Sequence, residues 1–309
     1  MPGVPDVTEF PARTWMRLEN RRWRHPEPEL LSYAPGGGLP RLREALAAHL
    51  RTARSVVCEP EQLILTTGSH QSIDLTLRLL ASPGEHVWLE DPCYWGLRSS
   101  LASLEARIVP VPVDAEGLAW QDGGPHPVPR AILVTPSHQY PLGMVMSLSR
   151  RRMLLEYAAT HKVWIIEDDY DSEFRYGGRP LASLQGMDTQ DRVLYMGTFS
   201  KIMFPGLRIG FLVVPESLAK AFATGIAELY RNGQVFLQAT LADFMALTQD
   251  LNLRVDASAA FAGKGAARPM DPTSALENWR TETCLFMLSR NGGPAIREPS
   301  PGSGDLFGG

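Results

Sequence analysis

Residues 192–215 read RVLYMGTFSKIMFPGLRIGFLVVP and contain two apolar runs, one at 192–200 and one at 207–215. Apolar runs of this length without regular alternation are typical of strands that are buried on both faces of a sheet. The link between the two runs is too short for a helical crossover. We therefore expect these two strands to lie antiparallel to each other.

Further apolar runs precede this pair, and segments with helical spacing lie between several of them. In 40–53, for example, Leu42, Leu46 and Leu50 would share one face of a helix. The pattern predicts an α/β fold, with a mostly parallel sheet between helices. We expect the other strands at 62–67, 86–91, 106–113, 130–136 and 162–168, and helices at 40–53, 69–81, 148–161, 216–232 and 235–251.

The two ends of the chain differ from this middle part. Residues 1–39 are rich in proline, glycine and arginine, and we expect them to form an extended arm. The large domain is expected over 40–250. Residues 251–309 have low apolar content and no periodicity, so we expect a poorly ordered tail without a packed core.

Composition narrows the class of protein. The 309 residues are 44% hydrophobic and 21% charged, with a formal net charge of −4, which argues against a protein whose main role is to grip nucleic acid. No apolar run approaches the roughly 20 residues that span a bilayer, and the first residues lack a signal-peptide pattern. The three cysteines have no metal-ligand spacing. We expect a reduced, cytoplasmic protein that binds no metal. We also expect that it contacts neither membrane nor nucleic acid.

Lys201 ends the first apolar run of the 192–215 segment, in a chain with few lysines. A lysine at the edge of a sheet can be desolvated, which lowers its pKa and lets it form a Schiff base. Taken alone, the position also fits an ordinary solvated lysine at the end of a strand.

Three other segments follow strands and have two interpretations each. The acidic segment EDDYDSEF (167–174) would point into the crevice where α/β sheets bind ligands, or would be a surface cluster. TTGSHQS (66–72) is a strand–turn–helix junction that suits a phosphate, or a helix capped by Ser69. Tyr94 is either a platform for a cofactor ring or a packing residue.

These segments occur together in one order, and the set resembles the pyridoxal-phosphate-dependent aminotransferases of fold type I. The resemblance is closest to the aminotransferase-like domain of MocR/GabR-type proteins and covers about residues 5–245. It rests on YAPGGGLPRLREALAAHL, LTTGSHQSIDL, EDPCYWGLR, TPSHQYPLG, IIEDDYDSEFRY and TFSKIMFPGLRIGF.

The resemblance implies pyridoxal 5′-phosphate as the cofactor and a role for each matching residue. Lys201 would hold the cofactor as a Schiff base, and Asp168 would keep the pyridine nitrogen protonated so that the ring accepts electrons. Tyr170 would bond the ring oxygen, and Tyr94 would stack on the ring. The phosphate would be bound by Gly68, Ser69, His70, Thr198, Ser200 and Arg208, and by Tyr33 of a neighbouring subunit in a homodimer.

Three departures from the family pattern stand out. Tyr140 occupies the place of an asparagine in ordinary aminotransferases, which is a MocR-like feature. Neither the winged-helix head of the regulators nor the C-terminal small domain can be recognised, so we expect a large domain with both ends lost or replaced. That small domain supplies an arginine for the substrate carboxylate, and we can match none of Arg268, Arg280, Arg290 and Arg297 to it.

Three functions remain open at this point. The first is amino-group transfer between an amino acid and a 2-oxo acid, with Lys201 as Schiff-base partner and proton carrier. The second is a sensing domain in which pyridoxal phosphate and an amino compound shift a conformation that a DNA-binding unit reads. The third is a remnant that binds the cofactor but turns over poorly. Tyr140 favours sensing, whereas the lack of a DNA-binding head favours an enzyme.

Overall fold

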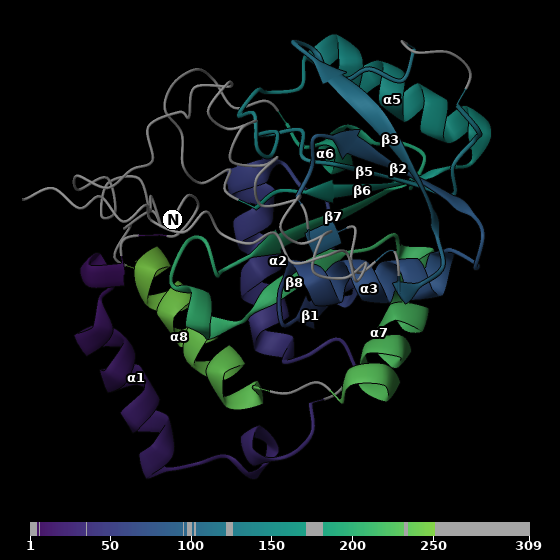
Figure 1. Cartoon of the computed structure of the whole chain (residues 1–309). Helices are drawn as coiled ribbons and strands as arrows, with labels where there is room; N and C mark the ends of the chain where they lie inside the picture. Colours follow the sequence, from purple (N-terminus) through teal and green to yellow (C-terminus); the bar gives the residue numbers. More distant parts are fainter. Residues whose placement is uncertain are drawn as a thin grey trace, which may run out of the picture.

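The computed structural model describes residues 5–250, apart from residues 6, 35, 95, 98–100, 102, 122–125, 171–181 and 232–233. Within the described residues, eight strands form a single sheet (Figure 1). The strands are β1 (Leu63–Thr66), β2 (His86–Asp91), β3 (Arg107–Asp114), β4 (Gly117–Leu118), β5 (Ala131–Val134), β6 (Trp164–Asp168), β7 (Val193–Thr198) and β8 (Gly210–Val213).

The order of the strands across the sheet is β1-β8-β7-β6-β5-β2-β3-β4. The strands β7, β6, β5, β2 and β3 run parallel to one another. At the two ends of this set, β8 is antiparallel to both β7 and β1, and β4 is antiparallel to β3. The predicted antiparallel pair at 192–215 is confirmed, as is the mostly parallel sheet. Because β8 is antiparallel to both of its neighbours, β1 runs in the same direction as β7. The carboxyl ends of β1, β2, β5, β6 and β7 therefore all lie at one edge of the sheet.

Helices cover both faces of the sheet (Figure 1). The α-helices are α1 (Ala12–Arg24), α2 (Pro40–Arg54), α3 (Ser69–Leu80), α5 (Leu148–His161), α6 (Leu184–Met187), α7 (Glu216–Tyr230) and α8 (Val235–Asp250). Short 3₁₀ helices are η1 (Val7–Glu9), η2 (Pro28–Leu31), η3 (Pro60–Gln62) and η4 (Pro205–Leu207).

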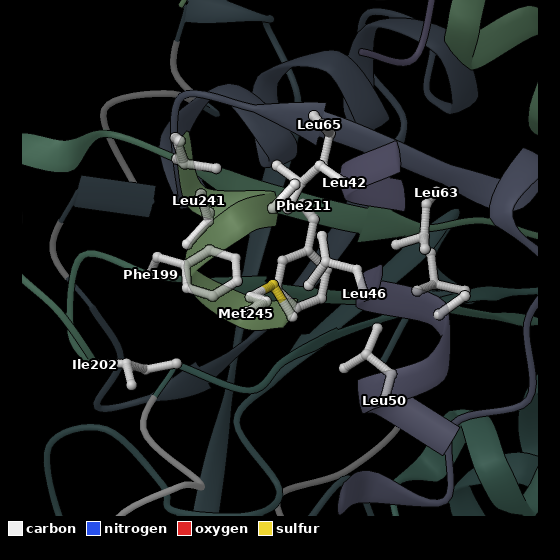
Figure 2. Close-up of a cluster of buried hydrophobic side chains, with 14 of the residues drawn as sticks. Leu42, Leu46, Leu50, Leu63, Leu65, Phe199, Ile202, Phe211, Leu241 and Met245 are labelled. Carbon is white, nitrogen blue, oxygen red and sulfur yellow. The ribbon is translucent and has the colours of Figure 1, made fainter. Parts of the chain in front are cut away.

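One face is covered by α2 and α8 over β1, β8 and β7. Figure 2 shows Leu42, Leu46 and Leu50 of α2 pointing into an apolar cluster that also holds Phe211 of β8 and Met245 of α8. All five side chains are buried. The helical face predicted from the leucine spacing is therefore confirmed, because these leucines lie one above the other on α2.

The opposite face is covered by α3 and α7. Successive strand residues point to opposite faces, so Ile64 lies between the α2-facing Leu63 and Leu65 and joins a second cluster instead. That cluster contains Ile73 of α3 and Phe222 of α7. The result is a three-layer α/β/α arrangement in which both faces of the sheet are apolar.

The helix α5 covers the rest of the first face. Leu154 of α5 packs in a cluster with Ile165 of β6 and Val193 of β7. The side chain of Ser147 caps the helix by accepting a hydrogen bond from the N–H of Arg150. The predicted helix over 148–161 has the same bounds in the structure.

The structure differs from the extended arm expected for 1–39, because Ala12–Arg24 is helical. Trp15 and Leu18 are its buried apolar residues, and the rings of Trp15 and Phe244 of α8 lie 5.9 Å apart. The segment is amphipathic, so the sequence carries a helical signal, but the proline, glycine and arginine content of 1–39 as a whole favours an extended arm. The domain boundaries stay a prediction, and the expected tail at 251–309 lies outside the described residues.

Among the helices that the structure describes, none has both the length and the apolar character needed to cross a bilayer.

Candidate active site

The carboxyl ends of β1 and β7 meet the amino end of β8 at one corner of the sheet. In the register, Gly210 lies opposite Thr66 of β1 and also opposite Thr198 of β7. Because β8 is antiparallel to both neighbours, the turns that follow Thr66 and Thr198 leave the sheet at the same edge. Two of the segments predicted to bind phosphate, 68–70 and 198–208, therefore meet at this corner.

Gly68 joins β1 to α3 with a φ of 122° and a ψ of −178°, a conformation that only glycine adopts readily. A Cβ atom on Gly68 would lie 3.3 Å from Nη2 of Arg208, so the guanidinium lies directly against the glycine. A Cβ atom on Gly210 would lie 2.7 Å from Cα of Gly68. The first turn of α3, whose N–H groups have no partners within the helix, thus opens beside Arg208, which suits an anion.

Thr198 and Ser200 supply two buried hydroxyl groups at this corner. The N–H of Phe199 donates to the carbonyl of Ile209 over 2.9 Å, so Ser200 and Arg208 flank one backbone hydrogen bond. The Oγ of Ser200 is buried and has no hydrogen-bond partner among the described residues. A buried polar group without a partner costs about 1–3 kcal/mol, and an anion bound here would relieve that cost.

Lys201 and Asp168 leave neighbouring strands at the same edge. Asp168 is buried at the end of β6 and pairs in register with Met196 of β7. Two residues further along, Thr198 ends β7, and the half-buried Lys201 follows in the next turn. Asp168, the predicted partner of the ring nitrogen, thus ends one strand. Lys201, the predicted Schiff-base lysine, lies in the turn after the adjacent parallel strand.

Tyr94 lies within the electrostatic reach of both Asp168 and Arg208. Burial is the main cause that raises the pKa of Tyr94; the Asp168 carboxylate raises it further, and Arg208 lowers it. Nε2 of His70 and the hydroxyl of Tyr94 are hydrogen-bonded at 2.9 Å. Burial, followed by the charge of Arg208, lowers the pKa of His70, so its imidazole is neutral at pH 7.

Four rings from three loops form a row that we call the aromatic wall: Tyr94, Tyr140, Tyr170 and His138. The rings of Tyr94 and Tyr140 meet edge to face at 5.8 Å, and those of Tyr140 and Tyr170 at 6.0 Å. His138 stacks on Tyr170 at 6.1 Å. Such contacts give a flat ligand an apolar surface next to Asp168.

A protein-family model described as "Aminotransferase class I and II" matches residues 4–264. The chain belongs to this family. A curated relative, the probable rhizopine catabolism regulatory protein MocR of Rhizobium meliloti, is 45% identical over 244 residues, which are 79% of this chain and 49% of that protein. The 2-aminoadipate transaminase of Thermus thermophilus is 31% identical, over 71% of this chain and 55% of that enzyme.

Solved structures of aminotransferases have the same fold. An archaeal alanine:glyoxylate aminotransferase superposes with a TM-score of 0.75 and 28% identity, covering 83% of this chain and 65% of that chain. The α-aminoadipate aminotransferase LysN of Thermus thermophilus, complexed with N-(5′-phosphopyridoxyl)-L-leucine, gives a TM-score of 0.73 at 27% identity and covers 83% and 66%. The chain spans about half the length of the curated relatives it matches.

The family and the fold type I architecture expected from the sequence motifs are confirmed. Pyridoxal phosphate is the cofactor of this aminotransferase family, and the residues of the corner fit it. The close approach of Gly68, the guanidinium of Arg208 and the unpartnered hydroxyl of Ser200 suit a phosphate group. The individual roles of the site residues stay predictions.

The acidic segment at 167–174 divides between two sides of the strand. Asp168 faces the site, because its charge acts on Tyr94. Glu167 is buried on the other side, where its carboxylate accepts hydrogen bonds from the N–H groups of Leu184 at 2.9 Å and Gln185 at 3.0 Å. Burial is the main cause that raises the pKa of Glu167 to about 7. Residues 171–174 lie outside the described residues.

Sequence reasoning missed Glu90, which is buried at the end of β2. Its Oε2 accepts hydrogen bonds from Oγ1 of Thr135 at 2.6 Å and from Nε2 of Gln139 at 3.3 Å. The same Nε2 donates to the carbonyl of Pro92 at 2.8 Å. Glu90 therefore ties the loop that carries Tyr94 to the loop after β5. A carboxylate at the end of an apolar strand, as in HVWLED, was the available signal.

Tyr33 is separate from these groups. It follows η2, is 77% exposed, and borders a surface hollow that Val235 and Phe236 also line. No residue predicted to bind the cofactor within the subunit lines that hollow. A role of Tyr33 in a neighbouring subunit therefore stays a prediction. The arginines at 268, 280, 290 and 297 lie outside the described residues.

Proposed function

We propose that this chain binds pyridoxal phosphate at the carboxyl edge of its sheet and transfers an amino group between an amino acid and a 2-oxo acid. The observation that carries the proposal is the corner where Arg208 lies against Gly68 and the buried hydroxyl of Ser200 has no partner. Lys201 lies in the turn that follows β7, the strand paired with the one that ends at Asp168. Family membership adds the reaction class.

Each residue has a defined task in this proposal. When bound, the cofactor supplies an electron sink for the bonds at the substrate α-carbon. Asp168 holds a proton on the ring nitrogen, because its buried carboxylate stabilises a positive charge there. Tyr170 orients the ring oxygen, and Tyr94 covers one face. Lys201 Nζ would hold the cofactor covalently and, once the amino group of a substrate has replaced it, would be free to carry the proton at the α-carbon.

The substrates, partners and location of the whole protein belong to the same proposal. The ligands are an amino acid and a 2-oxo acid, and a second copy of the chain would bring Tyr33 to the phosphate of its neighbour. The exposure of Tyr33 supports this arrangement, since a tyrosine that served its own subunit would be covered. We place the protein in the cytoplasm.

A second function, the sensing of pyridoxal phosphate with an amino compound, is favoured by one observation. Tyr140 lies in the middle of the aromatic wall, in contact with both Tyr94 and Tyr170, where ordinary aminotransferases carry an asparagine. The 45% identical relative is a regulatory protein by its name. In this alternative, the same residues bind the cofactor, but the protein forms little product.

Covalent attachment of the cofactor tests the proposal. Incubation with pyridoxal phosphate should give a yellow protein, and borohydride reduction followed by peptide mapping should find the label on Lys201. The variant Lys201→Ala should remain unlabelled and keep its far-ultraviolet circular dichroism. Label on Lys162, Lys220 or Lys264 of the parent protein would contradict the assignment.

A second measurement, on protein that has bound pyridoxal phosphate, distinguishes the enzyme from the sensor. A panel of amino acids is added, and formation of pyridoxamine phosphate and of the 2-oxo acid is followed by chromatography. An enzyme forms both repeatedly when pyruvate or 2-oxoglutarate is supplied as acceptor. A sensor binds the amino compound, seen as a spectral shift, without repeated turnover.

A further inference from the structure

The residue between Asp168 and Tyr170 is a second buried carboxylate, Asp169, whose side chain has no exposed surface. Its Oδ2 accepts a hydrogen bond from Nε of Arg54 at 2.8 Å and lies 2.7 Å from Nη2 of the same guanidinium. The hydroxyl of Tyr195 on β7 also donates to this oxygen. Asp169 is thus held by two elements other than its own.

Arg54 is the last residue of α2, and its side chain is only 4% exposed. Besides Asp169, it contacts the loop after β5, since Nη2 donates to Oγ of Ser137 at 2.9 Å. A guanidinium is planar and presents its donors in a fixed fork, so two acceptors bound to it are held at a fixed separation. Arg54 therefore links the segment after β6 to the loop after β5.

These two segments carry most of the aromatic wall. Tyr170 follows Asp169 directly, and His138 and Tyr140 follow Ser137 closely. The rings of the two segments touch, at 6.1 Å for His138 and Tyr170 and at 6.0 Å for Tyr140 and Tyr170. The strands that precede the two segments are paired, with Val134 of β5 opposite Glu167 of β6. Beyond the ends of these strands, Arg54 joins the two segments through side-chain contacts and so contributes to the shape of the wall.

We infer that Arg54 is a positioning residue of the cofactor site, which it shapes by holding Asp169 and Ser137 together beneath the aromatic wall. The inference rests on the proposed function. Arg54 itself need not touch the cofactor, because Asp169 connects it by one peptide unit to Asp168 and by another to Tyr170. The chemical class of ligand is the flat pyridine ring that Asp168 and Tyr170 are proposed to hold.

A purely structural role for this ion pair predicts a different outcome. Buried ion pairs often contribute little net stability, but loss of one partner leaves an uncompensated charge. Arg22 and Asp243 supply a second pair for comparison, with an Nη2–Oδ1 distance of 2.5 Å and side chains 8% and 17% exposed. The other oxygen of Asp243 lies 2.9 Å from Nη2 of Arg21, so this carboxylate keeps one cationic partner when Arg22 is replaced. That pair joins α1 to α8, and its side-chain hydrogen bonds, within the part of the chain that the structure describes, reach no predicted site residue.

The test compares Arg54→Met, Arg54→Lys and Arg22→Met with the parent protein. The Kd of pyridoxal phosphate is measured by absorbance titration, the visible absorption and circular dichroism of the bound cofactor are recorded, and stability is measured by urea unfolding. We expect Arg54→Met to raise the Kd about tenfold and to change the dichroism of the bound cofactor, because the rings that contact it are displaced. Arg54→Lys keeps the charge without the fork and should fall in between.

Arg22→Met should lower the unfolding midpoint and leave the Kd and the cofactor spectra unchanged. If Arg54→Met lowers stability while its Kd and spectra match those of the parent, Arg54 is structural and the inference is overturned. Should Arg54→Met fail to fold, Ser137→Ala removes one acceptor only, and an unchanged Kd and spectrum in that variant overturn the inference equally. A parent protein that binds no cofactor on Lys201 would instead refute the proposed function.

Discussion

The phosphate corner and the aromatic wall lie at the same edge of the sheet but are built in different ways. The corner is built on a backbone approach, that of Gly210 to Gly68, and the guanidinium of Arg208 lies against the same glycine. The wall consists of side chains from separate loops, held from behind by Glu90 and Arg54. A backbone contact leaves no room for any side chain, whereas a side-chain contact can be replaced in part by water or by a neighbour.

The largest effect is expected where two backbones touch, in Gly210→Ala. The new Cβ would lie 2.7 Å from Cα of Gly68 and 3.1 Å from its backbone nitrogen, so the turn must move. We expect urea unfolding to show a loss of about 1–3 kcal/mol, together with weaker binding of pyridoxal phosphate. Gly206→Ala is the matched control, because its Cβ would meet nothing closer than 3.7 Å, at Phe204. Equal stability of the two variants would mean that the corner is not rigid.

A smaller and pH-dependent effect is expected behind the wall, in Glu90→Gln. Burial raises the pKa of Glu90 from 4.5 to about 7, and hydrogen bonds from Thr135 and Gln139 oppose that rise. The folded chain therefore binds more protons than the unfolded chain between these pH values. Stability from this group is present below pH 4.5 and is lost as the pH rises to 7.

The amide in Glu90→Gln keeps an accepting oxygen and does not titrate. We expect the free energy of unfolding of the variant, minus that of the parent, to increase by about 3 kcal/mol from about pH 4 to about pH 8 and to level off above. Taking the difference cancels the opposite slope from His49 and His70, whose pKa values are lowered by burial. A difference that does not depend on pH would show that folding leaves the pKa of Glu90 unchanged.

The smallest effect is expected in Tyr94→Phe. Tyr94 is half-buried and stands at the end of the wall next to the exposed His70. The ring stays, so its contact with Tyr140 is kept, and the hydrogen bond to His70 is lost. Because His70 is exposed, water can replace the hydroxyl, and we expect a loss of about 0.5–1 kcal/mol in urea unfolding. The Kd of pyridoxal phosphate should stay within about threefold of that of the parent. A larger rise would assign the hydroxyl itself to the binding of the cofactor.

Local patterns in the sequence predicted most elements of the fold. The strand at 86–91 and the helix at 148–161 have the predicted bounds. The apolar run of the strand is buried over successive residues, and Leu154 and Ala158 lie on one buried face of the helix. The helix Ala12–Arg24 was not expected although it is amphipathic, because the composition of 1–39 as a whole favours an extended arm. The pairing of β1 with β8 was also not expected, because it joins segments far apart in the chain.

For the site, motifs indicated Lys201, Asp168 and the turn at Gly68 as residues to bring together, and strand order then placed them at one edge. Nothing in the sequence indicated that Arg54 would meet Asp169, which is 115 positions away. Apolar periodicity determines which face of an element is buried, since the hydrophobic effect depends only on burial. Which polar groups meet depends on direction and distance within about 3 Å, and only the packed arrangement of the sheet and helices decides that.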